Sequence, residues 1–269
     1  MTRISASRST RSLGQIAAAL ALTAIGTVAH AALPVFSFDP AAAGLIGTSF
    51  TANNLLISDF STVTFDASGT TFTDTGFLSI SAAQSASGAT FTPGGLNDTY
   101  GMYIQFSGKG NVVAGGDPSL VDTKGSFTEL NYTLYGYNGS ASFGFTGNTP
   151  TTTAASPMVL ATGTLISGSA RTSAEGDGTF TPSGSARLNF AAVASGFYAT
   201  PSTFYNVAST SFSNTFSQVE PFANGFRIRQ GGGSINFATA VPEPGTYALL
   251  AADLGVVGFV ARRKTRRPD

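Results

Sequence analysis

The chain has 269 residues, of which only 10% are charged, and it contains one His, no Cys and no Trp. This length permits one large β domain or two small ones, and so low a charged fraction, together with 32 Gly, is atypical of a cytosolic enzyme. The charges cancel overall, but residues 32–240 hold 6 basic and 11 acidic residues, a net charge of −5. This weakly acidic segment argues against nucleic-acid binding, which requires a basic face.

The first 31 residues have the pattern of a secretory signal peptide. Their basic start is formed by Arg3, Arg8 and Arg11. Residues 13–28 are mainly Ala, Leu, Ile and Val, and Ala29-His30-Ala31 has the small-x-small pattern of a signal-peptidase site. The alternative, an amphipathic first helix of the domain, fits less well because the apolar stretch is uniform rather than one-sided. We therefore expect export by the general secretory route, with Ala29 and Ala31 as the cleavage-site residues.

Cleavage after Ala31 removes the sole histidine, His30, and leaves a chain with neither His nor Cys. This excludes Ser-His-Asp and Cys-His nucleophilic catalysis, as well as zinc sites built from imidazole or thiolate. Carboxylate chemistry and calcium binding remain open.

The C-terminal segment, residues 241–269, contains three successive parts. Pro242-Glu243-Pro244 is a tripeptide hostile to helix formation, and residues 245–261 are mainly apolar. A basic cluster follows, formed by Arg262, Arg263, Lys264, Arg266 and Arg267. This order predicts a short transmembrane helix with a cytoplasmic positive anchor, in which the central Asp253 costs about 2.5–3.5 kcal/mol on insertion. Such a helix would suit a segment that stays in the membrane only briefly. The alternative interpretation of residues 245–269 is a buried terminal helix followed by a basic tail.

This tripartite segment resembles the PEP-CTERM sorting signal of Gram-negative bacteria. The resemblance makes Pro242, Glu243 and Pro244 the recognition tripeptide and residues 262–267 the membrane stop signal. It implies handling by exosortase, a membrane protease-transpeptidase associated with exopolysaccharide production. The family's helix is uniformly apolar, and Asp253 departs from that pattern. The implied destination is the cell surface or extracellular matrix.

Residues 32–240, between the two sorting segments, are expected to form an all-β extracellular domain. Alternating apolar residues at Met102, Ile104 and Phe106 fit a strand with one buried face. Further strands are expected at residues 61–66, 76–81, 126–137, 158–167, 204–217 and 234–238. This pattern predicts an antiparallel β-sandwich or jelly roll, and two smaller sandwiches divided at residues 147–157 are the alternative.

Carboxylates are the remaining candidates for catalysis, because glycosidases work with two of them. The only glutamates of the domain are Glu129, Glu175 and Glu220, and none lies in a local motif. We therefore expect no catalytic site, and a hydrolase of exopolysaccharide is the least favoured hypothesis.

Loop carboxylates raise the alternative of calcium binding. The candidates are the segment 173–178, which holds Glu175 and Asp177, and also Asp66, Asp74, Asp117 and Asp122. Their spacing matches no calcium-binding repeat, and Asp-Gly turns are common between strands, so no metal or cofactor site is assigned. Tyrosines that offer sugar stacking are Tyr100, Tyr103, Tyr132, Tyr135 and Tyr137, for which core and cross-strand packing is the favoured interpretation.

Ser and Thr are abundant in the domain, where their hydroxyls keep the outer face of a sheet soluble without charge and also offer hydrogen bonds to a polysaccharide. The body is similar to flocculation-associated PEP-CTERM proteins. The similarity lies in residues 50–53, 74–78, 95–103, 127–130, 132–135, 161–163, 195–197 and 201–205. It implies a non-enzymatic matrix protein that promotes cell aggregation with exopolysaccharide. A calcium-dependent carbohydrate-binding β-sandwich is the alternative.

Overall fold

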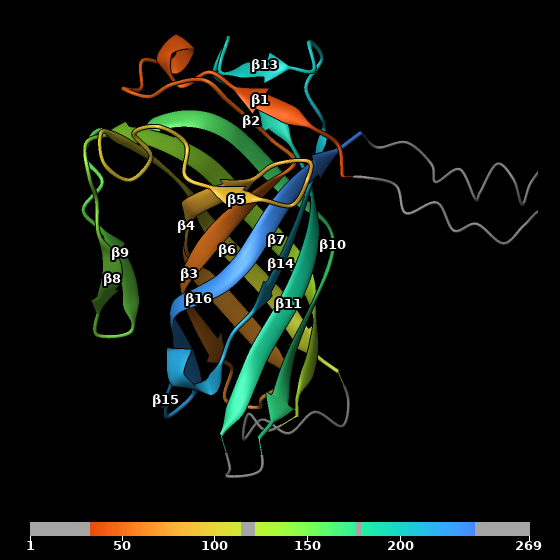
Figure 1. The fold of residues 1–269 in the computed structure, drawn as a ribbon. Coiled ribbons are helices and arrows are strands. Elements are labelled where there is room, and N and C mark those ends of the chain that lie inside the picture. Colours follow the sequence, from red (N-terminus) through yellow and green to blue (C-terminus); the bar gives the residue numbers. More distant parts are fainter. Residues whose placement is uncertain (1–32, 114–121, 176–178, 240–269) are drawn as a thin grey trace, which may run out of the picture. The chain divides into compact units, whose positions relative to one another are not determined.

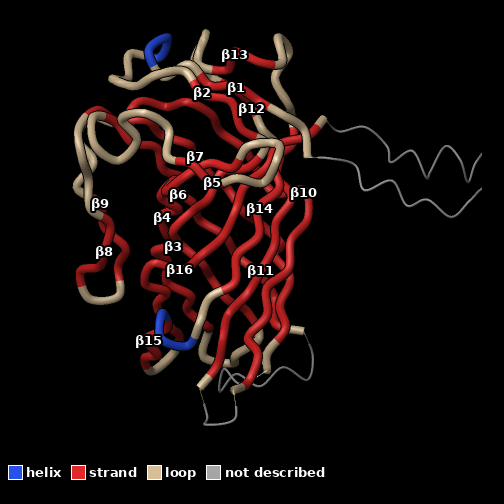
Figure 2. The backbone as a smooth tube through the Cα atoms, viewed as in Figure 1, coloured by secondary structure: helices blue, strands red, loops and turns tan. Residues whose placement is uncertain are grey.

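A computed structural model describes residues 33–113, 122–175 and 179–239 of the chain (Figure 1). The predicted signal peptide, with Ala29 and Ala31, and the predicted sorting signal 241–269 lie outside these residues. No helix within the three described ranges is long and apolar enough to cross a membrane. Figure 2 shows that strands make up nearly all regular structure in this part of the chain, beside the single-turn helices η2 (Ala41–Ala43) and η3 (Phe216–Gln218). The predicted all-β class is confirmed.

Eight strands of the described chain form one closed antiparallel barrel. Each pairs with the next along the chain, and the last pairs with the first, so the sheet has no break. In chain order they are β3 (Asn54–Phe65), β4 (Thr71–Gln84), β6 (Tyr100–Val112), β7 (Lys124–Asn138), β10 (Met158–Ala174), β11 (Phe180–Asn189), β14 (Val207–Ser213) and β16 (Gly225–Ala238).

This closed sheet differs from the predicted sandwich or jelly roll. Alternation of apolar and polar residues shows that a strand has one buried face, but it does not show what covers that face. A second sheet covers it in a sandwich, and the opposite wall covers it in a barrel, so the pattern does not distinguish the two folds. The division into two smaller sandwiches at residues 147–157 is wrong, because β7 and β10, on either side of that segment, are paired neighbours in the same barrel.

Local irregularities in strand pairing help the sheet to curve. Register shifts interrupt the pairing of β3 with β4 at Leu56/Ile57, of β10 with β7 at Val159/Ala161, and of β16 with β3 at Arg229/Gly231. A β-bulge bends its strand and increases the local twist, which eight strands need in order to close. The inward side chains then form one apolar core that includes residues from every barrel strand.

One end of the barrel is covered by a small sheet with the order β13-β1-β2 (Figure 1). Its strands are β1 (Phe36–Phe38), β2 (Phe50–Ala52) and β13 (Tyr198–Thr200). We call the ring cluster beneath it the aromatic cap, formed by Phe36, Phe38, Phe190, Phe197, Tyr198, Phe204 and Phe237. Phe36 and Phe237 meet edge to face at 4.9 Å, so the small sheet is joined to barrel strand β16 by packing.

A hairpin of β8 (Phe143–Thr146) and β9 (Thr149–Thr152) packs on the outer wall. Phe143 lies 5.5 Å from the ring of Tyr103 and 6.0 Å from that of Phe77, in a second apolar cluster separate from the interior. The guanidinium of Arg227 lies 5.5 Å from the ring of Phe145, which also ties the hairpin to β16. The remaining short strands are β5 (Thr90–Phe91), β12 (Ala191–Ala192) and β15 (Val219–Phe222).

Candidate functional site

The three glutamates considered for catalysis are each engaged by a different partner. Glu129 on β7 forms an ion pair with Lys109 at 3.5 Å, and Glu175 accepts a hydrogen bond from Thr181. Glu220 on β15 is bound by two arginines, Arg227 and Arg229. In the described ranges no three acidic or histidine side chains gather in a group that could hold a metal ion.

Of the four carboxylates considered for calcium that the structure describes, three have structural partners, namely Asp66, Asp122 and Glu175. Asp66 accepts hydrogen bonds from Ser68 and from the backbone N–H groups of Thr71 and Thr70, which lower the pKa of Asp66 to about 2. Asp122 pairs with Arg171 at 3.0 Å. Asp117 and Asp177 lie outside the described residues.

The expectation that Asp74 lies in a loop is wrong. It occupies the middle of β4 and is 5% exposed, because the alternation of this strand points it into the barrel. No local motif marks Asp74 as inward, since it lies between Thr73 and Thr75 in an ordinary strand pattern.

The tyrosines are packing residues, as the favoured interpretation predicted. Tyr100 and Tyr132 belong to the main core, and Tyr103 and Tyr137 are buried under the β8–β9 hairpin. Tyr135 is half-buried and stacks across the strands on Tyr103, with ring centroids 5.2 Å apart.

The outer wall carries a polar surface that spans four neighbouring strands, β10, β11, β14 and β16. Across these strands, Ser169, Ser185, Ser211 and Ser234 lie opposite one another in register, and a second row runs through Ser167, Arg187, Ser209 and Asn236. We call these eight residues the hydroxyl lattice. Its members alternate along each strand with inward residues such as Ala186, Ala208 and Ile235, which explains why they face outward.

Sheet geometry sets the spacing of the lattice at about 4.8 Å between strands and roughly 6.8 Å between rows. Because the side chains are short, most of the lattice lines a shallow hollow of about 590 Å³ rather than a ridge. Each hydroxyl offers one donor and two acceptor positions, so the hollow is rich in hydrogen-bonding groups. Arg187 is the one charged member of the lattice, and it has no acidic partner among the described residues.

Part of this surface is formed by a short sequence repeat, which the alternation of apolar and polar residues did not reveal. Ser-Gly-Ser-Ala-Arg occurs at residues 167–171 and again at residues 183–187. The two copies pair antiparallel, with Ser169 opposite Ser185 at the centre. A search for short direct repeats would have found this signal, whereas strand prediction treats both copies as ordinary polar-outward segments.

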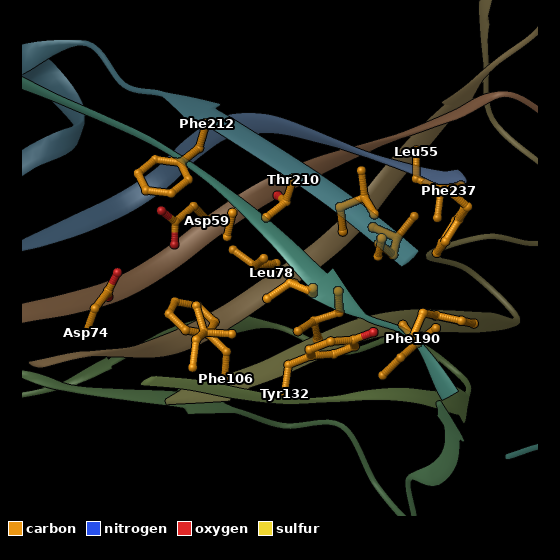
Figure 3. A pocket seen from close by; sticks show the side chains of 18 of the residues that line it. Leu55, Asp59, Asp74, Leu78, Phe106, Tyr132, Phe190, Thr210, Phe212 and Phe237 are labelled. Atoms are coloured by element: carbon orange, nitrogen blue, oxygen red, sulfur yellow. The ribbon is translucent and has the colours of Figure 1, made fainter. Parts of the chain in front are cut away.

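The barrel interior holds a second candidate site, a cavity of about 50 Å³ (Figure 3). Its lining is mostly aliphatic and aromatic but includes Asp59 and Asp74, and no lining residue is basic. Burial raises the pKa of Asp59 to about 7, against the opposing effect of the Ser61 hydroxyl. Burial also raises the pKa of Asp74 well above its usual value, and the charge of Asp59 adds to this increase.

Comparison with known families identifies the C-terminal segment and not the barrel. Residues 240–267 match the family model of the PEP-CTERM protein-sorting motif, which spans Pro242, Glu243, Pro244 and the basic cluster. No curated protein and no solved structure matches the chain. The motif implies export across the inner membrane and processing by exosortase. The chain therefore carries a PEP-CTERM protein-sorting motif at residues 240–267, which supports an exported protein that exosortase sorts.

Proposed function

We propose that the barrel domain is a non-enzymatic matrix protein that holds exopolysaccharide on the hydroxyl lattice and thereby promotes cell aggregation. The observation that carries this proposal is the lattice itself, a hollowed outer face on which one row has a serine on each of four strands and the row beside it alternates serine with Arg187 and Asn236. The PEP-CTERM motif supports a destination at which such a polymer is present.

The chemistry of the lattice suits a hydrated polymer better than a small ligand. One hydrogen bond contributes only about 0.5–1.5 kcal/mol net, because water competes for the same groups. A polymer that contacts several lattice residues on each of many protein molecules gains from effective concentration, so weak individual contacts still give lasting attachment. The low charge of the domain also reduces electrostatic repulsion between coated cells.

The proposal of a non-enzymatic role is supported by the state of the carboxylates. Glu129, Glu175 and Glu220 each have a polar or charged partner, and they come from different elements of the fold. A glycosidase needs two carboxyl groups facing one sugar across about 5–10 Å. The test is release of reducing sugar from the producer's exopolysaccharide, for which we expect none above the polymer alone.

Binding is tested by co-sedimentation of the exported chain with exopolysaccharide from the producing cells. Alanine at Ser167, Ser185 and Ser211 removes lattice hydroxyls from three strands. The matched control places alanine at three exposed hydroxyl residues on β4 and β6, namely Thr73, Thr75 and Ser107. We expect the lattice variant to lose most of its binding and the control to keep it. Equal binding by both variants would remove the lattice from the proposal.

Aggregation is tested in the producing cells. Deletion of the protein should reduce flocculation, the wild-type chain should restore it, and the lattice variant should be exported in equal amount without restoring it. Normal flocculation in the deletion strain would contradict the proposed role.

A further inference from the structure

A polar ligand fits the outer wall of the barrel better than its interior. The interior cavity, of about 50 Å³, is far smaller than the roughly 300–1,000 Å³ of small-molecule sites, and its lining is mostly aliphatic and aromatic. The hollow over the hydroxyl lattice, of about 590 Å³, falls within that range, and its lining includes five serines, Asn236 and Arg187. The chemistry of this wall therefore decides which class of polymer the barrel can hold.

Two basic side chains on this wall lack an acidic partner. The described ranges contain six Lys and Arg residues. Four of them form ion pairs with carboxylates, namely Lys109, Arg171, Arg227 and Arg229. The other two, Lys124 on β7 and Arg187 on β11, have no acidic partner among the described residues, and both are exposed. The described wall therefore offers two cations to an anionic ligand.

The register of three strands sets these two cations on opposite sides of a row of serines. Ser126 on β7 lies opposite Ser169 on β10, so the row that has a serine on each lattice strand continues onto a fifth strand. Lys124 lies two residues from Ser126 on one side of this row, and Arg187 lies two residues from Ser185 on the other. With about 4.8 Å between strands and roughly 6.8 Å between rows, the Cα atoms of the two cations are about 17 Å apart, and Ser169 lies midway on the diagonal between them.

We propose that the lattice takes a linear acidic polysaccharide, a polymer of uronic acids, which lies along this diagonal with one carboxylate on Lys124 and another on Arg187. The inference rests on the proposed function and names the class of its polymer. A guanidinium binds a carboxylate through two parallel N–H bonds, and a lysine ammonium adds a point charge. The serines between the two cations donate to and accept from the hydroxyl groups of the sugars. Because the two cations lie further apart than the length of one sugar ring, a polymer joins them and a single sugar does not.

The composition of the wall favours an acidic polymer over a neutral one. A neutral sugar offers the lattice only hydrogen bonds between uncharged groups, and water competes for all of them. A carboxylate adds charge-assisted hydrogen bonds, which are about twice as strong. None of the eight lattice residues is aromatic, so stacking on a ring does not replace the missing charge.

Nucleic acid is another anionic polymer, and this wall suits it poorly. Proteins that hold single strands combine a basic groove with aromatic side chains on which the bases stack, and the lattice contains no aromatic residue. Residues 32–240 hold 6 basic and 11 acidic residues, so the domain as a whole repels a dense polyanion. Two unpaired cations release few counterions from a phosphate backbone. A polymer with widely spaced carboxylates and many hydroxyl groups matches the wall better.

The experiment measures the affinity of the exported chain for three soluble polymers. They are polygalacturonate, the same polymer as its uncharged methyl ester, and single-stranded DNA. The charge variant combines Lys124→Gln with Arg187→Gln. The matched control combines Lys109→Gln with Arg171→Gln, which remove the same formal charge from paired positions. A third variant, Ser169→Glu, places a carboxylate midway along the diagonal.

We expect the wild type and the matched control to bind polygalacturonate at least fivefold more tightly than the methyl ester or DNA. The charge variant should lose roughly four- to twenty-five-fold of its affinity for polygalacturonate, because two distant contacts of about two- to fivefold each combine independently. Its affinity for the methyl ester should stay unchanged. Ser169→Glu should also lose polygalacturonate binding, whereas Ser107→Glu, at an exposed position on β6, should keep it.

Equal binding of polygalacturonate and its methyl ester would overturn the inference, and so would DNA binding as tight as that of polygalacturonate. Equal losses in the charge variant and the matched control would overturn it as well. In each of these cases the proposed function still stands if the variant with alanine at Ser167, Ser185 and Ser211 loses its binding to the producer's exopolysaccharide. A wild-type chain that binds no polysaccharide at all would contradict both.

Discussion

Ser169 and Ser185 lie directly opposite each other on β10 and β11, with their Oγ atoms 3.5 Å apart, at the centre of the paired Ser-Gly-Ser-Ala-Arg repeats. The antiparallel pairing gives the surrounding surface an approximate two-fold symmetry, with Arg171 at one end and Arg187 at the other. The two ends differ in local net charge, because the Asp122 carboxylate lies 3.0 Å from Arg171 whereas Arg187 has no acidic partner among the described residues. One end of the repeat therefore remains available for an anion.

Replacement of Arg187 by Gln should weaken binding to an acidic polysaccharide such as polygalacturonate by about two- to fivefold, since an exposed charge interaction contributes up to about 1 kcal/mol. Binding to a neutral polymer should change less, and the salt dependence of acidic-polymer binding should decrease. The control is Arg171→Gln, whose charge is already paired. Equal losses in both variants would show that the unpaired state of Arg187 has no special role.

The aromatic cap should be a main source of stability. Phe38 is fully buried and its ring lies 4.8 Å from that of Phe197 and 5.5 Å from that of Phe50. Phe38→Ala should therefore lower the free energy of unfolding by about 3–5 kcal/mol, through lost contacts and a residual cavity. Phe216, which is 54% exposed, provides the matched control, and Phe216→Ala should change stability by less than about 0.5 kcal/mol. Denaturant titration of both variants measures the difference.

Asp59 should make the protein less stable as pH rises. Its folded-state pKa of about 7 exceeds the usual 3.8, so between these values the folded chain holds the proton more tightly than the unfolded chain. The stabilising effect of that proton is full below about pH 4 and is lost as pH rises through 7. The total is on the order of 4 kcal/mol for a fully buried group.

Asp59→Asn should remove this part of the pH dependence and raise stability at pH 8. Two other titratable side chains line the cavity, Asp74 and Tyr132. The pKa of Asp74 is also raised, so Asp74 makes its own contribution to the pH dependence of stability in both proteins. Burial raises the pKa of Tyr132, which therefore does not titrate between pH 4 and pH 8. Urea titrations of both proteins from pH 4 to pH 8 provide the test. Parallel pH profiles of the two proteins would show that Asp59 is not the source of this pH dependence.

Gly163 is required by the close approach of two backbones. A Cβ atom at this position would lie 1.9 Å from the carbonyl oxygen of Asn189, which also accepts a hydrogen bond from the Tyr132 hydroxyl at 3.1 Å. Gly163→Ala should therefore displace that carbonyl and cost about 1–3 kcal/mol of stability. Gly144→Ala, where no atom lies within 4 Å of the added Cβ, should have almost no effect on the unfolding midpoint.

The strands could be predicted from the sequence, whereas the closure of the barrel and the inward position of two Asp residues could not. Alternation at Met102 and Ile104 correctly identified a strand and its inward face, because a two-residue period depends only on local geometry. The intervening Tyr103 is buried as well, since the β8–β9 hairpin covers it. Closure depends on the pairing of β16 with β3, which are far apart in the chain, and no local pattern encodes it. The interior position of Asp59 and Asp74 was missed for a related reason: polar residues are assigned to the outer face by default.

The C-terminal motif was predictable because it depends on order and composition rather than on tertiary contacts. The lattice was partly predictable: the abundance of Ser and Thr was visible, but the alignment of Ser169, Ser185 and Ser211 into one row depends on the register of three strands.

Closure of the barrel also bears on how such a protein behaves when concentrated outside the cell. Each of the eight barrel strands has a neighbour on both sides in the described chain, so none presents a long row of free N–H and C=O groups. Exposed edges recruit strands from other copies and start fibrous aggregates, a hazard that grows for a chain with little charge to keep copies apart. Among the described strands, only the short ones outside the barrel, such as β2, β13, β8 and β9, keep an open edge. The long barrel strands therefore offer no backbone template for self-assembly, so contacts made by the barrel wall depend on its side chains.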